Sequence, residues 1–125
     1  MGRVYDTIVL DSKSLHALFD SGVVHNYITK EVAEGLTTQV IPEPFEVGLG
    51  GKTQTVSDAC LVVGRVQDRL FDFSAHVIED IGRDENGKEI DVIIGATEMQ
   101  RWNIKIDPKD EKLDLSRFRK EFIEY

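Results

Sequence analysis

The sequence predicts an all-β domain, closed and barrel-like, with one or two short helices. Apolar residues fall in short runs that mostly alternate with polar ones, which is the period of a strand. Glycine, proline and asparagine separate these runs and mark turns. The apolar fraction of 41% is sufficient for a packed core, and 125 residues correspond to a single domain over 1–125.

The first half of the chain predicts strands and one helical segment. Residues 7–10 and 17–19 are apolar runs flanking a polar turn, so we expect a hairpin that leads into Asp20. Residues 30–36 have a helical spacing of apolar side chains, although Gly35 weakens the helix. Two prolines keep the next segment extended, and residues 45–58 read as strand, glycine turn and strand.

The second half continues the strand pattern. Asn86-Gly87 lies in a polar stretch and is a strong turn signal. We expect strands at 59–65, 70–78, 91–94, 104–106 and 112–115, and one or two helical turns at 97–102. In the tail, 116–125, aromatic residues recur every three or four positions, which predicts a docked helix.

Composition excludes several classes of protein. There are 15 basic and 23 acidic residues, a net charge of -8, so nucleic acid is not expected as a partner. No apolar run is long enough to span a bilayer, and charged residues interrupt the N-terminus, so no membrane association is expected and a cytoplasmic protein is the default. The lone Cys60 allows no intrachain disulfide and reads as a strand residue.

In the glycine-rich stretch from Val47 to Thr53, Gly51-Lys52-Thr53 resembles the end of a phosphate-binding loop, but the first glycine of that motif is replaced by Glu46. Strand-like residues also follow where the motif requires a helix. We therefore interpret the stretch as a hairpin tip. Glycines at 48, 50 and 51 make such a tip flexible, which suits a lid over a ligand as well as it suits a plain turn.

The three histidines do not form a recognisable site. None stands at metal-ligand spacing with another His, Cys or acid, so no metal and no cofactor are expected. Ser21 and His25 could suggest a nucleophile and a base, but Phe19 occupies the position where a nucleophile elbow has glycine.

Asp20-Ser21-Gly22 is ordinary turn composition, but its setting is unusual. Apolar residues 17–19 precede the acid directly, and two valines follow the glycine. A carboxylate is costly to ionise beside apolar side chains unless hydrogen bonds compensate, and such a group suits general acid–base chemistry. Two facing carboxylates that share a proton can activate water, and Asp80-Ile81-Gly82 is a poor second copy. The second acid would therefore come from a second chain.

These residues resemble the retropepsin-like family of aspartic proteases over residues 7–115. Ala17 to Gly22 is similar to the strand and Asp-Thr/Ser-Gly loop of that family, and residues 25–28 (HNYI) are similar to proteases of retrotransposon type. The apolar strand ending at Gly95, followed by a short helix, resembles the second hallmark of the family. The glycine-rich tip falls where the family has its flap. The resemblance implies the acid protease fold.

The resemblance also implies roles. Asp20 would be the catalytic acid, Ser21 would tie two active-site loops together across a homodimer, and Gly22 would bring backbone N–H groups close. Ile93, Ile94 and Gly95 would pack behind this loop. An extended peptide or protein substrate would bind between the loop and the flap, against Val23, Val47, Gly48, Leu49, Gly50 and Gly51.

Two departures leave a second reading open. Val23 replaces the usual alanine, and Thr97 stands where many members have an acid that makes a side-chain tie. The first hypothesis is a homodimeric aspartic endopeptidase. The second is an inactive dimer of the same fold that binds peptides or serves as a scaffold, and the third is a β-barrel interaction domain in which Asp-Ser-Gly is only a turn.

Overall fold

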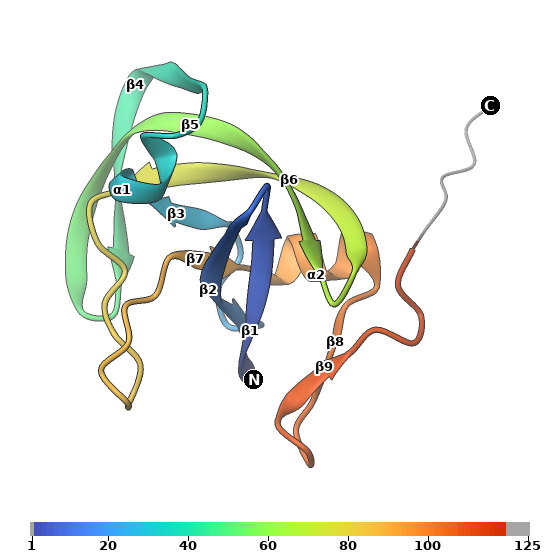
Figure 1. Ribbon diagram of the computed structural model, residues 1–125. Helices are drawn as coiled ribbons and strands as arrows, with labels where there is room; N and C mark the ends of the chain where they lie inside the picture. Colours follow the sequence, from blue (N-terminus) through green and yellow to red (C-terminus); the bar gives the residue numbers. More distant parts are fainter. Residues whose placement is uncertain (1, 120–125) are drawn as a thin grey trace.

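The computed structural model describes residues 2–119, which form nine strands and two short helices (Figure 1). The elements, in order, are β1 (Arg3–Leu10), β2 (Lys13–Asp20), β3 (Tyr27–Thr29), α1 (Lys30–Ala33), β4 (Thr38–Leu49), β5 (Lys52–Val66), β6 (Arg69–Ile78), β7 (Val92–Ile94), α2 (Ala96–Trp102), β8 (Lys105–Asp107) and β9 (Lys112–Asp114). The all-β prediction is confirmed.

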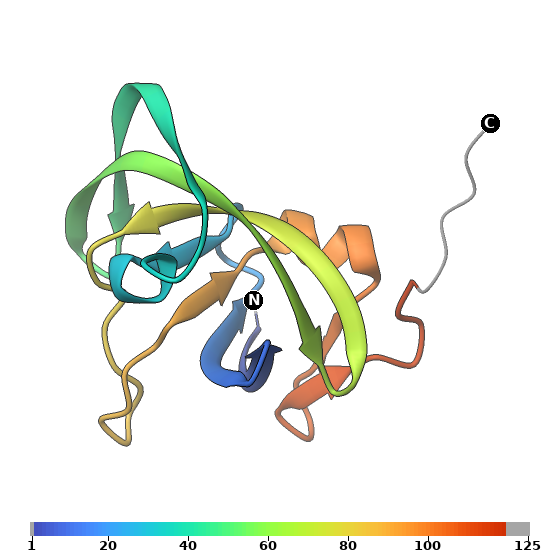
Figure 2. The same ribbon diagram turned by 45° about the horizontal axis from the view of Figure 1, so that its top comes forward.

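Six strands close into a ring, and a seventh extends from it. The large sheet has the order β1-β2-β7-β3-β6-β5-β4, and an additional pairing of β1 with β5 joins the first strand to the sixth. This closure leaves β4 attached to β5 alone, as an arm at one side of the barrel, while α2 and the β8–β9 hairpin lie at the other (Figures 1 and 2). The predicted barrel-like closure is confirmed, and it fills the interior with the largest buried side chains, which include Phe19, Phe71, Phe73 and Ile8.

The N-terminal hairpin has the predicted strands, but they are longer than the apolar runs. In β1 and β2 the register pairs Arg3 with Asp20 and Leu10 with Lys13 across a two-residue turn. Asp11 in that turn has a φ of 55°, a conformation that aspartate tolerates better than most residues. The register matters because it brings the first residues of the chain beside the end of β2.

The arm formed by β4 and β5 differs from the sequence prediction. We expected the strand after the glycine turn to end at 58 and a separate strand to cover 59–65, but β5 is continuous from Lys52 to Val66, with buried residues mostly at alternate positions. The partner strand β4 carries the irregularity, because its register shifts between Val40 and Phe45. Pro42 and Pro44 lie in this interval and have no N–H to donate to a ladder.

The two helices are short and each ends for a local reason. The side chain of Thr29 accepts a hydrogen bond from the N–H of Val32 and caps α1, which ends at Ala33, two residues before Gly35. The second helix, α2, ends at Trp102 and is capped by Asn103, whose φ of 55° is a left-handed capping conformation. Neither helix, nor any other within residues 2–119, is long and apolar enough to cross a membrane.

The segment after β9 only partly matches the predicted docked helix. Phe118 is buried and stacks on Trp102 with ring centroids 5.5 Å apart, so the segment docks against α2. Residues 116–119 are not helical, since Ser116 and Arg117 form a turn. The remainder of the predicted helix, 120–125, lies outside the described residues.

Candidate active site

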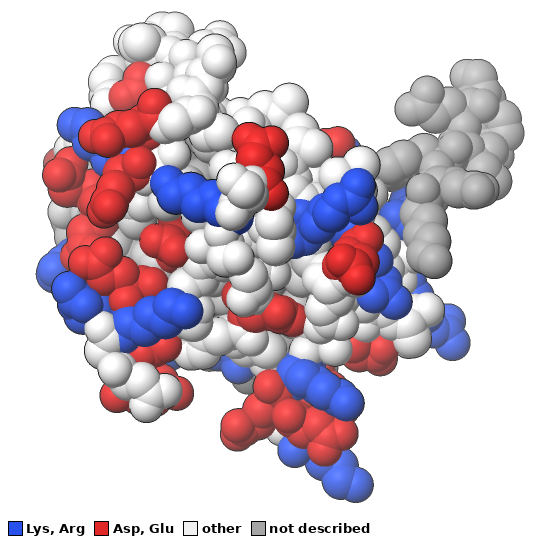
Figure 3. Space-filling model, in the orientation of Figure 1, with Lys and Arg blue, Asp and Glu red and all other residues white. Residues whose placement is uncertain are grey.

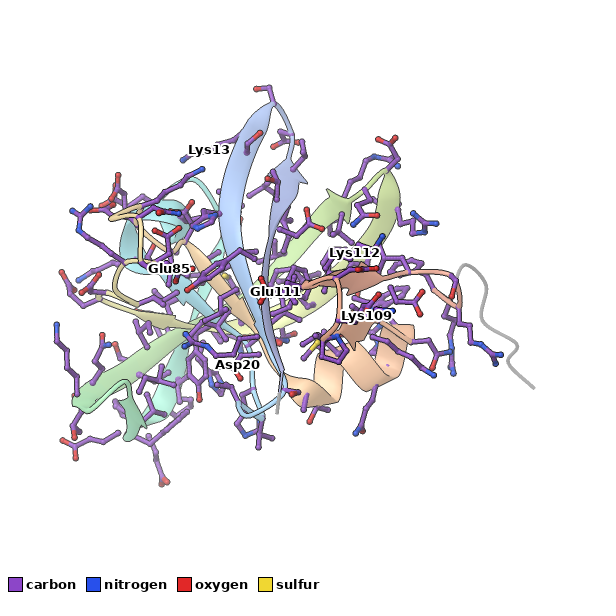
Figure 4. The ribbon with its side chains drawn as sticks, turned by 90° about the horizontal axis from the view of Figure 1, so that it is seen from below. Lys13, Asp20, Glu85, Lys109, Glu111 and Lys112 are labelled. Carbon is purple, nitrogen blue, oxygen red and sulfur yellow. The ribbon has the colours of Figure 1, made fainter. Side chains whose placement is uncertain are left out.

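Asp20 ends β2 at the rim of the barrel, with a side chain that is only 15% exposed. Its Oδ1 accepts a hydrogen bond from the N–H of Gly22 at 2.8 Å, and its Oδ2 lies 3.4 Å from Nε of Arg3. These two contacts supply the compensation that a carboxylate next to a buried strand requires. Figure 4 shows Asp20 at the end of the hairpin opposite Lys13.

Ser21 is exposed and is bound to the N-terminal segment of its own chain. Its hydroxyl accepts a hydrogen bond from the N–H of Gly2 at 2.7 Å and lies within donating distance, 3.3 Å, of the Gly2 carbonyl oxygen. The backbone N–H of Ser21 donates to the same carbonyl at 3.0 Å. No sequence pattern indicated this contact, which follows from the register of β1 on β2.

The loop after Gly22 is fixed from behind by β7 and by Gly95. Strand β7 lies between β2 and β3, in parallel register with β2 that pairs Ile94 with Phe19. At Gly95 an added Cβ would lie 2.7 Å from the carbonyl oxygen of Val23, so only glycine fits there. The N–H of Ala96 donates to that same carbonyl at 2.6 Å. The apolar strand and its glycine therefore support the loop, as expected from the sequence.

A groove of about 390 Å³ separates this loop from the arm. It is lined by Gly22, Val23, Val24, His25, Tyr27, Val47, Gly48 and Leu49. Of the predicted site residues, five therefore meet in one groove, whereas Asp20, Ser21, Gly50 and Gly51 do not line it. Gly50 and Gly51 form the turn at the tip, with φ of 56° and 81°, and have open space around them.

A buried polar network that sequence analysis missed connects the loop to α2. The side-chain nitrogen of Asn26 donates to Oε1 of Glu98 at 3.0 Å, and its oxygen accepts the N–H of Gly95 at 2.9 Å. The other oxygen of Glu98 accepts from the indole of Trp102 at 2.8 Å. Asn26 and Glu98 are 7% and 9% exposed. A side-chain tie between loop and helix is thus present, made by Glu98 rather than by Thr97. Thr97 contributes its backbone N–H, which donates to the carbonyl oxygen of Val24 at 3.4 Å.

An aromatic cluster lies between the groove and the base of the arm. The His76 ring lies 5.7 Å from that of His25, 5.8 Å from that of Tyr27 and 5.1 Å from that of Phe45 on β4. Burial, and the nearby His25, lower the pKa of His76. Burial also raises the pKa of the Tyr27 hydroxyl. His76 is therefore neutral at neutral pH.

The second Asp-x-Gly sequence makes a different kind of site. Oδ1 of Asp80 accepts from the N–H of Gly82 at 3.2 Å, a turn like that of Asp20. Its side chain, however, is 57% exposed and lies 3.8 Å from Nζ of Lys52. Asp80 is thus a solvated acid beside Lys52 of β5. Acidic and basic side chains are interspersed on the side of the molecule where β4 and β5 lie (Figure 3). Within residues 2–119 no group of three or more His, Cys, Asp or Glu could hold a metal ion.

The closed barrel, the Asp20 loop backed by Gly95 and the glycine-tipped arm together define a retropepsin-like fold. The retroviral protease-like domain of Ddi1 from Leishmania major is a solved structure with this fold. It matches with a TM-score of 0.67 and 20% sequence identity, over 94% of this chain and 91% of that chain. No protein-family model and no curated protein sequence matches the chain.

Proposed function

We propose that the protein is a homodimeric aspartic endopeptidase, in which two copies of Asp20 activate a water molecule. The observation that carries this proposal is the position of Asp20 next to the groove. Gly22 donates its N–H to the Asp20 carboxylate and also lines the groove beneath the arm. A carboxylate that is 15% exposed, beside a groove with apolar walls, is a suitable place for acid–base chemistry.

The chemistry follows from two like charges held close together. Two facing carboxylates cannot both ionise, so they share one proton. The ionised member removes a proton from water, whose oxygen bonds to the peptide carbonyl carbon, while the protonated member donates to the carbonyl oxygen. Transfer of a proton to the leaving nitrogen then allows the C–N bond to break. The sequence offers one suitable acid per chain, so the second comes from a second copy.

The substrate in this proposal is an extended peptide. Val23, Val47 and Leu49 give the groove apolar walls, and the peptide would lie between the loop and the arm in the manner of an added strand. The glycines at the tip of the arm allow it to move over the bound chain.

One observation favours the second candidate, a dimer of this fold that binds peptides or acts as a scaffold without catalysis. The hydroxyl of Ser21 is engaged by Gly2 of its own chain, whereas the catalytic proposal uses it across the dimer. The choice between the two candidates depends on whether peptide bonds are hydrolysed.

The test is cleavage of a mixed peptide library by the native chain and by Asp20→Asn. We expect Asp20→Asn to abolish cleavage while circular dichroism and thermal unfolding stay close to native. The matched control is Asp80→Asn, which changes the other Asp-x-Gly turn and should cleave like the native chain. Cleavage that persists in Asp20→Asn, or that no chain shows from pH 3 to about 8, contradicts the peptidase.

A further inference from the structure

The first residues of the chain contact both polar groups of the Asp20-Ser21 loop. The N–H of Gly2 donates to the Ser21 hydroxyl at 2.7 Å. The carbonyl oxygen of Gly2 accepts from the N–H of Ser21 at 3.0 Å and from its hydroxyl at 3.3 Å. A hydroxyl has one proton to donate and two lone pairs to accept with. When Ser21 donates to Gly2, it has no proton left for a second chain.

Arg3 adds an ion pair to the same segment. Its Nε lies 3.4 Å from Oδ2 of Asp20, and its side chain is 61% exposed. The Arg3 guanidinium therefore lies at the carboxylate that the proposed function needs.

Gly2 is also seated against the second sheet. A Cβ at this position would lie 2.9 Å from Cγ2 of Ile106 on β8, so the segment packs closely there. Gly2 and Ser21 form one end of a groove of about 550 Å³ whose other walls include Ala96, Met99, Ile104 and Pro108. Detachment of Gly2 would free the hydroxyl and the N–H of Ser21 and would open this mostly apolar groove.

We infer that residues 2–3 are an intramolecular latch, which competes with a second copy of the chain for the Asp20-Ser21 loop. The inference rests on the proposed homodimer and adds its regulation: each chain must release the latch before two loops can meet. The latch is weak enough to open, because the Arg3 side chain of its ion pair is 61% exposed and its hydrogen bonds are at the surface.

The experiment measures the dimer dissociation constant by sedimentation equilibrium for the native chain, Arg3→Gln, Gly2→Ala and the control Lys13→Gln. Lys13→Gln makes the same charge change at the opposite end of the same hairpin (Figure 4). Amide hydrogen exchange of Ser21, recorded on dilute monomer, reports latch opening independently of dimerisation and of activity.

We expect Arg3→Gln to lower the dissociation constant by roughly two- to twenty-five-fold, because an ion pair near the surface changes an equilibrium by up to about fivefold and each of the two chains releases one. Gly2→Ala should act in the same direction, since its Cβ crowds Ile106. The Ser21 amide should exchange faster in both variants. In about 1 M salt the difference between native and Arg3→Gln should shrink.

If the native chain dimerises and neither Arg3→Gln nor Gly2→Ala lowers the dissociation constant, the latch is overturned and the proposed function stays intact. Chains that stay monomeric in every variant at every concentration contradict the homodimer, and the latch is rejected with it. Lys13→Gln should match the native chain. If Lys13→Gln lowered the dissociation constant as much as Arg3→Gln does, the change in net charge would explain the effect and the latch would be overturned.

Discussion

Asn26 and Glu98 form a buried hydrogen bond of 3.0 Å that joins the loop after Asp20 to α2, although the two residues are 72 positions apart. Asn26 also accepts from the N–H of Gly95, and Glu98 also accepts from Trp102 and Arg101. All four side-chain oxygen and nitrogen atoms of this pair have partners. Such a network specifies one arrangement of loop and helix because each broken bond leaves a buried polar group unsatisfied.

Replacing Asn26 should therefore be costly. We expect Asn26→Ala to lower the free energy of unfolding by about 3 kcal/mol, since the Gly95 N–H and Glu98 each lose a buried partner. Urea denaturation measures this change. The control Asn86→Ala, in an exposed turn, should change it by less than about 0.5 kcal/mol. Equal effects of the two substitutions would mean that the network does not hold the loop.

Gly95 should be the least replaceable glycine within residues 2–119. In Gly95→Ala the new Cβ meets the carbonyl oxygens of His25 and Val23, which belong to the loop backbone and cannot move cheaply. We expect a loss of about 3 kcal/mol or more in denaturant unfolding. Gly48→Ala is the matched control, because nothing lies within 4 Å of its added Cβ, and it should stay within about 1 kcal/mol of native. A loss of less than about 1 kcal/mol in Gly95→Ala would contradict the close approach of Gly95 to the loop backbone.

His76 should make stability depend on pH around neutrality. Burial and His25 lower its pKa in the folded state, so the unfolded state binds more protons between this pKa and the ordinary value of about 6.5. The free energy of unfolding should therefore fall as pH drops below about 6.5 and level off below the folded pKa. In His76→Phe this slope should flatten. Denaturation curves from pH 5 to about 8 measure this dependence. If the free energy of unfolding of His76→Phe varies with pH as steeply as that of the native chain, other groups cause the dependence.

Asp84 should contribute in a lower pH range. The N–H of Lys88 lowers its pKa most, and the His16 side chain and the N–H of Asn86 lower it further. A carboxylate with a lowered folded pKa stabilises above its ordinary pKa of about 4, and this contribution is lost as pH falls through the folded value. Asp84→Asn should therefore be less stable at pH 6 to about 7 and show a weaker acid slope. Acid titration of unfolding checks this, with the neighbouring Glu85→Gln expected to behave like native (Figure 4).

Local patterns predicted much of this fold and part of the site. Apolar runs bounded by turn residues identified the β1–β2 hairpin, the glycine tip of the arm and the strand before Gly95. The continuity of β5 was not predictable, because Asp58 and Ala59 look like a break until β4 and β6 pair on either side. The length of a strand depends on the neighbouring strands with which it pairs, and a local sequence pattern does not identify those neighbours.

The contacts that fix the site were the least accessible from sequence. Glu98 reads as an ordinary acid on a short helix, and only its burial beside Asn26 distinguishes it. Arg3 reads as an ordinary terminal charge, and only the hairpin register brings it to Asp20. A single sequence carries residue types and spacing, whereas these pairs depend on how distant strands come together.

The central proposal is that one site needs Asp20 from two chains, and mixing native chain with Asp20→Asn tests it most directly. The two chains are unfolded together in equal amounts, refolded and assayed for peptide cleavage at fixed total concentration. Random pairing puts two native carboxylates in about a quarter of the dimers, so activity should fall to about a quarter of the native value. Activity of about half, the value expected when each chain works alone, would contradict the shared site.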